Sequence, residues 1–149
     1  MIRAALGTVC GGETYEPPAP IVRGVRIWDL TGSVHPQVWD GLVDTAGDRT
    51  VIPLAVCRDL NLAARDKRST KGFDRQAKAS LLPRYYVRVG VEDIGEVSLL
   101  VYGVERPSVL LGRDFLSGLL LLMDAGRSQW WLGRPTCVTR CLLPFLALR

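Results

Sequence analysis

The stretch WDGLVDTAGDRTVIP, residues 39–53, decides the fold of this 149-residue chain. Apolar residues within 38–43 predict a short buried strand, and that strand ends at the carboxylate of Asp44. A hydroxyl and two of the smallest residues follow in Thr45-Ala46-Gly47, before a second carboxylate at Asp48. The segment therefore predicts a strand that ends in an acidic side chain and a turn of little bulk.

A second motif follows later in the chain, VLLGRDFL at residues 109–116. It predicts a short buried strand over 109–111 that runs through Gly112-Arg113-Asp114 into a turn of helix. Together the two segments resemble the retropepsin-like aspartic proteases, across roughly residues 20 to 133. Two motifs at this separation are more specific than either one alone.

The resemblance implies an all-β fold, a small closed β-barrel of retropepsin type with one or two short helices. It also implies an aspartic endopeptidase that hydrolyses a peptide or protein substrate without a cofactor or metal. A chain of this length forms about one domain, and it has one Asp-Thr element followed by small residues. A site with two carboxylates would therefore need two copies of Asp44, across the axis of a two-fold homodimer.

The resemblance also assigns roles around Asp44. Thr45 would send its hydroxyl across the dimer axis to the partner's backbone. Ala46 and Gly47 complete the active-site loop, although the family's usual order is glycine followed by alanine. A Cβ at position 46 has a cost only if the backbone there needs a positive φ or a close approach. Asp48 and Arg113 match a buried ion pair of the family, whose loss would cost roughly 3 to 5 kcal/mol.

Two segments are expected to contact substrate. Arg49 would border a substrate pocket and favour acidic or polar side chains. Residues 63–82 are charged and predict an exposed hairpin or loop, where the family has its flap. Gly72 and Phe73 are the candidate tip of that flap.

Strict alternation of apolar and polar residues over 85–92 predicts a strand, and 97–102 predicts its hairpin partner. Residues 119–123 and 129–132 predict a last hairpin. Pro53 suits the start of a short helix that extends to Leu62.

We expect three regions in the chain: a flexible leader over 1–20, the protease domain over 21–133, and a C-terminal tail of unknown role over 134–149. The leader contains Gly11-Gly12 and several prolines, which is typical of a loose segment.

Composition limits other functions. The net charge of +4 comes largely from a basic stretch at 65–75, which is more typical of a solvated loop than of a nucleic-acid surface. No apolar run is long enough to span a bilayer, so no membrane partner is expected.

The four cysteines lack the spacing of a zinc site, and reduced thiols in a cytoplasmic protein are expected. His35, which precedes Pro36, is expected in a surface turn, and Asp114 at a helix start.

Other functions stay open. The chain could be a catalytically inactive retropepsin-like barrel that serves as a peptide-binding or dimerisation module, an alternative that Ala46 favours. It could also be the protease domain of a mobile-element polyprotein, although no polymerase or nucleocapsid segment adjoins it here.

Overall fold

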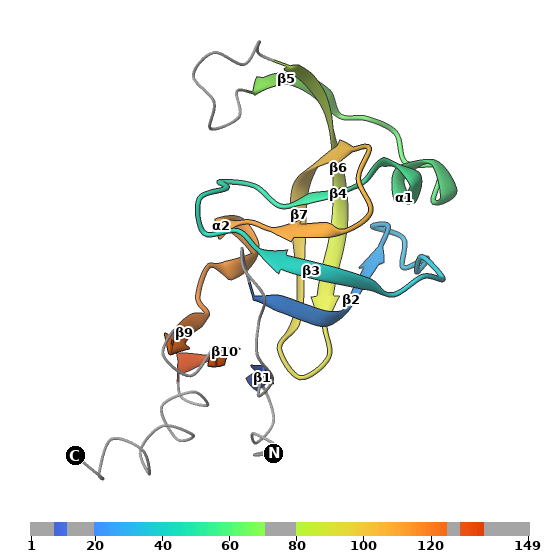
Figure 1. Ribbon diagram of the computed structural model, residues 1–149. Helices are drawn as coiled ribbons and strands as arrows, with labels where there is room; N and C mark the ends of the chain where they lie inside the picture. The colour runs from blue at the N-terminus through green and yellow to red at the C-terminus, as the bar shows by residue number, and fades with distance from the viewer. Residues whose placement is uncertain (1–7, 12–19, 71–79, 125–128, 136–149) are drawn as a thin grey trace, which may run out of the picture.

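A computed structural model describes residues 8–11, 20–70, 80–124 and 129–135 of the chain (Figure 1). These residues form ten strands and two short helices, so this part of the protein is mostly β. The predicted flap tip at Gly72 and Phe73 lies outside the described residues, as do Cys137 and Cys141.

Seven strands form the main sheet. Their order is β2 (Ile21–Trp28), β3 (Trp39–Val43), β8 (Val109–Leu111), β4 (Val51–Pro53), β7 (Gly95–Val104), β6 (Ser80–Val91) and β5 (Asp66–Thr70). β2 also pairs with β6 in an antiparallel register, so the pairings return to the first strand. β5 and the first residues of β6 extend beyond this circuit as a two-stranded arm (Figure 1).

The hairpin of β6 and β7 confirms the alternation in the sequence. Tyr85, Val87, Val89 and Val91 are all buried on one face of β6. The strands pair from Arg84 with Tyr102 to Val91 with Gly95. The chain reverses through Asp93 at φ 69° and Gly95 at φ 114°, a backbone conformation that glycine and aspartate tolerate better than most residues.

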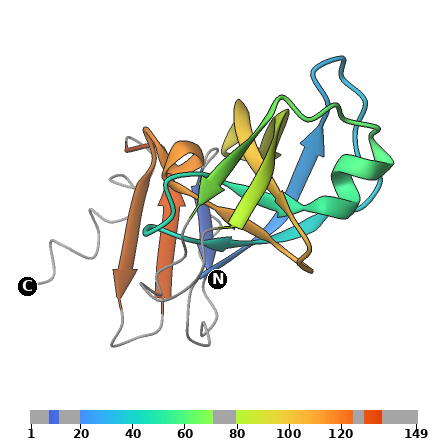
Figure 2. The ribbon, with the colours of Figure 1, turned by 90° about the horizontal axis from the view of Figure 1, so that it is seen from above.

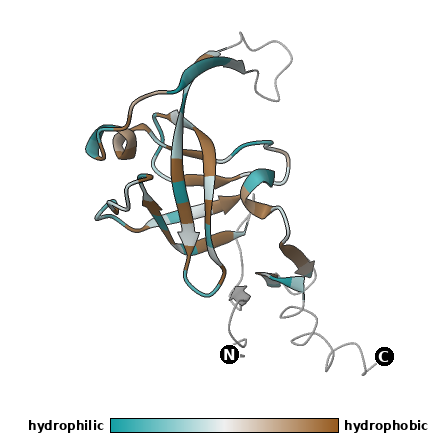
Figure 3. Ribbon diagram, turned by 180° about the vertical axis from the view of Figure 1, so that it is seen from behind, coloured by the Kyte–Doolittle hydropathy of each residue, from teal (hydrophilic) through white to brown (hydrophobic). Residues whose placement is uncertain are grey.

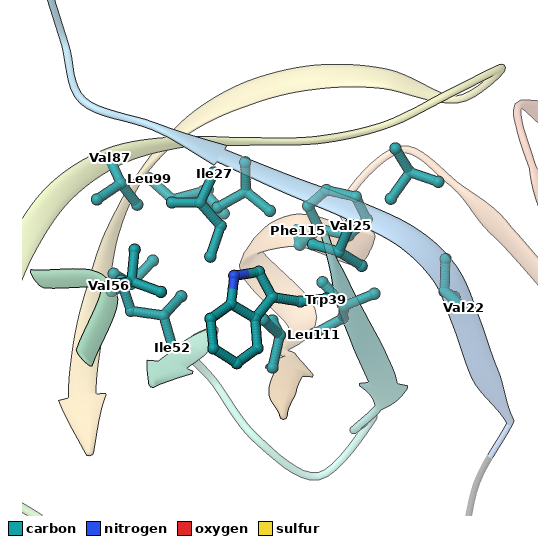
Figure 4. Close-up of a cluster of buried hydrophobic side chains, with 14 of the residues drawn as sticks. Val22, Val25, Ile27, Trp39, Ile52, Val56, Val87, Leu99, Leu111 and Phe115 are labelled. Atoms are coloured by element: carbon teal, nitrogen blue, oxygen red, sulfur yellow. The ribbon is translucent and has the colours of Figure 1, made fainter. Parts of the chain in front are cut away.

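The core is built mainly from β-branched residues of the main sheet, and Trp130 and Leu132, which lie outside that sheet, are buried in the same cluster. Figure 4 shows the Trp39 indole surrounded by aliphatic side chains from several strands, with Phe115 of α2 (Arg113–Leu116) close by. Val56 of α1 (Leu54–Asp59) packs into the same cluster and is fully buried. A short helix follows Pro53, as predicted, but Pro53 itself ends β4 with φ −57° and α1 ends at Asp59, before the expected Leu62. Among the described residues, no helix is long and apolar enough to cross a membrane.

A smaller sheet lies beside the main one (Figure 2). Its order is β1 (Thr8–Gly11), β10 (Gln129–Gly133) and β9 (Leu120–Asp124), all antiparallel. The hairpin of β9 and β10 agrees with the sequence. β1 falls within the span expected to be a flexible leader, and it is held by a ladder with β10 that the leader's composition did not indicate. The division into leader, domain and tail remains a prediction.

His35 is not a surface residue, so that expectation was wrong. Its side chain is only 4% exposed, and Nε2 lies 3.0 Å from Oδ2 of Asp59 at the end of α1. The turn after β2 folds back so that the His35 N–H donates to the carbonyl of Ile27 at 2.8 Å. This brings the imidazole to 5.7 Å from the Trp39 ring, between centroids. A histidine here joins the β2–β3 connection to α1.

Leu111→Ala tests the core beneath the second motif. The Leu111 side chain is fully buried, so its truncation leaves a cavity and should reduce the free energy of unfolding by about 2 to 5 kcal/mol. Leu81→Ala is the matched control, because Leu81 is 64% exposed and its loss should change stability little. Urea unfolding followed by tryptophan fluorescence measures both. Equal effects of the two substitutions would contradict this packing.

Candidate active site

The Asp44 backbone is fixed by the neighbouring strand. β3 and β8 pair in parallel, with Val43 opposite Leu111. The Asp44 N–H then donates to the Leu111 carbonyl at 3.0 Å, one residue beyond the end of β3. The candidate carboxylate therefore starts from a rigid position where the two sequence motifs lie side by side.

The Asp44 side chain is half-buried and is held by its own loop. Oδ1 accepts hydrogen bonds from the N–H of Ala46 at 3.1 Å and of Gly47 at 3.0 Å. Such a turn, closed by an aspartate side chain, orients the carboxylate without help from another element. A Cβ built on Gly47 would lie 2.7 Å from Asp44 Oδ2, so the small residue at 47 leaves room for the carboxylate in this orientation.

Ala46 carries no backbone strain. The non-glycine residues with positive φ in the described part of the chain are Asn61 and Asp93, and Ala46 is not among them. An alanine with negative φ loses nothing relative to glycine in backbone terms. The transposed order Ala46-Gly47 thus suits this loop, and the Ala46 methyl group is exposed at its surface.

The end of the loop is tied to α2 by a buried threonine that the sequence analysis did not select. The Thr50 Oγ1 donates to Asp114 Oδ1 at 2.7 Å and accepts from the Gly112 N–H at 3.2 Å. The Thr50 N–H donates to the same Asp114 oxygen at 2.8 Å. Asp114 accepts a backbone N–H bond, as expected, but from a loop 64 residues away as well as from its own helix, through Phe115.

The contact between the loop and α2 leaves no room for a side chain at Gly112. A Cβ built there would lie 2.4 Å from the Arg49 carbonyl carbon and 2.7 Å from the Thr50 nitrogen. Both atoms are backbone and cannot rotate away. A second backbone bond, from the Arg113 N–H to the Gly47 carbonyl at 2.9 Å, closes the same contact. The glycine of the second motif is therefore required by close approach.

Asp48 and Arg113 form an ion pair between the loop and α2, but the pair is not buried. The Arg113 side chain is 61% exposed and that of Asp48 is 76% exposed. The expected cost of roughly 3 to 5 kcal/mol for losing one member of this pair applies to a charge left buried without a partner. In the single chain, water solvates the remaining charge, so that cost does not apply. An exposed pair of this kind contributes about 0 to 1 kcal/mol.

Two further cations lie near the loop. Arg49 is exposed, and within the described residues it has no ion-pair partner. Arg106, between β7 and β8, was identified in the sequence only as a break between strands. Its guanidinium is half-buried, and Nε donates to the Ser108 carbonyl at 2.6 Å. Burial lowers the pKa of Arg106, and the negative charge of Asp44 acts in the opposite direction, so the two groups lie within electrostatic reach.

No other chemistry gathers in the described part of the chain. Across residues 8–11, 20–70, 80–124 and 129–135, no three histidine, cysteine or acidic side chains form a metal cluster. Cys57 is a free, buried thiol, and burial raises its pKa to about 12. A thiol with so high a pKa stays protonated near neutral pH and is a poor nucleophile.

Comparisons with known proteins give a likeness of fold. No protein-family model matches the chain, and a search of curated proteins finds no match. A foamy viral protease–reverse transcriptase is similar at TM-score 0.48 and 17% identity over 67% of this chain, which spans only 12% of the viral chain. EIAV protease, solved with the inhibitor HBY-793, is similar at TM-score 0.47 and 21% identity over 70% of this chain and 91% of its own.

A retropepsin-like aspartic protease from Rickettsia conorii is similar at TM-score 0.47 and 11% identity, over 81% of this chain and 98% of its own. The similar structures are proteases of retroviral or retropepsin-like type, the class that the two sequence motifs resemble.

The hydroxyl network should matter more to folding than the ion pair. Thr50→Val keeps the shape of the side chain but leaves Asp114 Oδ1 and the Gly112 N–H without the hydroxyl, so it should cost about 1 to 3 kcal/mol. Asp48→Asn removes one charge of an exposed pair and should cost less than about 1 kcal/mol. Thermal unfolding of the two variants gives the order of the effects, and the reverse order would contradict it.

Proposed function

We propose that this chain is an aspartic endopeptidase of retropepsin type. The single observation that carries the proposal is the Asp44 carboxylate at the end of β3, half-buried and oriented by two backbone N–H groups. The closed barrel of the proposal is supported by the circuit of pairings that returns from β6 to β2. Asp44 is the catalytic residue, and Thr45, Ala46 and Gly47 form its loop.

The proposed reaction needs two copies of the chain. Hydrolysis by carboxylates uses one ionised group to deprotonate a water and one protonated group to donate to the peptide carbonyl. Two carboxyl groups about 3 Å apart share one proton because they cannot both ionise. The chain supplies one such group, so the second is Asp44 of another copy across a two-fold axis. Thr45 and Ala46 are exposed on the loop, where a second copy would cover them.

In this dimer Asp48 and Arg113 support the loop from the side of α2. The partner would also shield their ion pair from solvent, so removal of one member would cost more than in the single chain, because the other charge would be left buried without a partner. The energetic role of the pair is then a property of the assembled enzyme.

The arm of β5 and β6 is the proposed flap. β5 is hydrophilic along its length (Figure 3), which suits a strand that projects into solvent. At the base of the arm, the Arg84 guanidinium donates two hydrogen bonds to the Asp66 carboxylate, one of them from Nε to Oδ1 at 2.7 Å. A flap anchored at its base can close over a bound peptide and exclude water. Gly72 and Phe73 are proposed as its tip.

Asp44→Asn should abolish peptide cleavage while leaving the fold intact, because asparagine keeps the shape but cannot take a proton from water. Turnover of a mixed peptide library, followed by mass spectrometry, measures the loss. The wild-type rate should peak below neutrality and fall as the shared proton is lost.

Asp40→Asn is the control for Asp44→Asn, since Asp40 is 45% exposed and pairs with the exposed Arg23 of β2. If the purified wild-type dimer cleaves nothing in the library, the inactive peptide-binding module takes the place of this proposal. The exposed Ala46 methyl group, where the family has glycine, is the feature that favours that alternative.

Arg49 and Arg106 should favour acidic or polar side chains in the substrate, because Arg49 lies in the Asp44 loop and Arg106 is within electrostatic reach of Asp44. Arg49→Ala and Arg106→Gln should each lower kcat/KM for acidic peptides by about two- to fivefold relative to neutral ones, as expected of a partly exposed charge pair. Arg58→Gln is the control, since Arg58 pairs with Glu105 at the surface. An unchanged ratio of acidic to neutral cleavage would remove both residues from substrate selection.

A further inference from the structure

A cavity of about 630 Å³ lies between the β6–β7 turn, α2 and the end of β10, and Asp44 is not among its lining residues. Its apolar lining comes from Ile94, Val97, Phe115 and Leu119. Ile94 and Phe115 are 7% and 4% exposed, so they form a fixed floor. The volume falls within the range of ligand sites, and the proposed peptidase chemistry does not use it.

One wall of the cavity is an unpaired strand edge. β6 pairs with one side of β7 from Gly95 to Tyr102, whereas β4 pairs with the other side at Tyr102–Val104. In the part of the chain that the structure describes, no strand pairs with that second side over Gly95–Val101. The first four residues of β7 are exposed, and three of them, Gly95, Glu96 and Val97, line the cavity. Free backbone N–H and C=O groups on such an edge accept an added strand.

A cation stands at the rim of the same cavity. Arg134 follows β10, is exposed, and holds Nη2 3.8 Å from the position that a Cβ would take on Gly95. Within the described residues Arg134 forms no ion pair, and the neighbouring Glu96 carboxylate is paired with Arg88 Nε at 2.9 Å. The rim therefore offers one guanidinium to an incoming anion.

We propose that this cavity binds an extended peptide, which adds as a strand to the edge of β7 at Glu96–Ser98. One apolar side chain of the peptide packs on Phe115 and Leu119, and a carboxylate of the peptide pairs with Arg134. The open backbone edge, the apolar floor and the rim cation each match one part of such a ligand. A fatty acid would use the floor and the cation but would leave the strand edge unpaired.

The proposal goes beyond peptide hydrolysis and does not depend on it, because none of its contacts involves Asp44. The cavity does share α2 with the active-site loop, since Asp114 lines the cavity and also accepts hydrogen bonds from Thr50. The test below therefore reads binding directly, with no measurement of cleavage.

The probe is acetyl-Val-Leu-Val with a free C-terminal carboxylate, titrated into the full Asp44→Asn chain so that it cannot be cut. Two-dimensional NMR follows the Ile94 δ1 methyl group and the backbone amides of Glu96–Ser98. We expect saturable shifts there, with the Ile27 methyl group in the main core unchanged. Arg134→Gln should weaken binding about two- to fivefold, and Arg58→Gln should leave it unchanged.

Two modified probes test the parts of the ligand without altering the protein. The peptide with a C-terminal amide should bind the Asp44→Asn chain as weakly as the free acid binds the same chain carrying Arg134→Gln. The same peptide N-methylated at its leucine should lose binding, because it cannot donate to the strand edge. Absence of saturable shifts, equal binding of the N-methylated peptide, or equal shifts with decanoate would each overturn the proposal.

Discussion

A buried hydroxyl holds the candidate catalytic loop to the body of the protein. Thr50 bonds both the carboxylate of Asp114 and the N–H of Gly112, so the loop that begins at Asp44 ends on α2. Buried polar groups are costly when unpaired, and these bonds therefore restrict the loop to few conformations. The ion pair of Asp48 and Arg113 spans the same contact from outside but is exposed to water. The network of hydroxyl and backbone groups is the stronger constraint in the single chain.

The fixed position of the Asp44 loop also bears on the proposed hydrolysis, which needs a second carboxylate from another copy of the chain. The Asp44 carboxylate is held by its own loop and its backbone by β8, and Thr45 and Ala46 are exposed beside it. The other acidic groups at the loop have different partners, since Asp48 pairs with Arg113 and Asp114 accepts from Thr50. A two-fold axis through the loop would supply the partner carboxylate and cover the exposed residues together. Homodimerisation thus stays a proposal whose strength comes from the geometry of one loop.

The sequence predicted most where a short period or a motif sets the structure. The two-residue alternation in β6 and β7 and the apolar run of β8 were confirmed, because local spacing determines which face is buried. Burial of particular polar side chains depends on distant neighbours, and there the predictions failed or were incomplete. Asp48 and Arg113 form the expected ion pair, but the pair is exposed. His35, expected at the surface, is buried against α1. Thr50 was missed because its partners, Asp114 and Gly112, lie more than 60 residues away in the sequence, and Arg106 was missed because its place near Asp44 depends on the fold.

In the proposed mechanism, peptide cleavage requires a dimer, and a single chain is inactive. Sedimentation equilibrium and peptide turnover, measured on the same dilution series, test it most directly. We expect the cleavage rate per chain to fall on dilution in proportion to the fraction of chains in the dimer. A chain that sediments as a monomer and still cleaves peptide at an undiminished rate would contradict the claim.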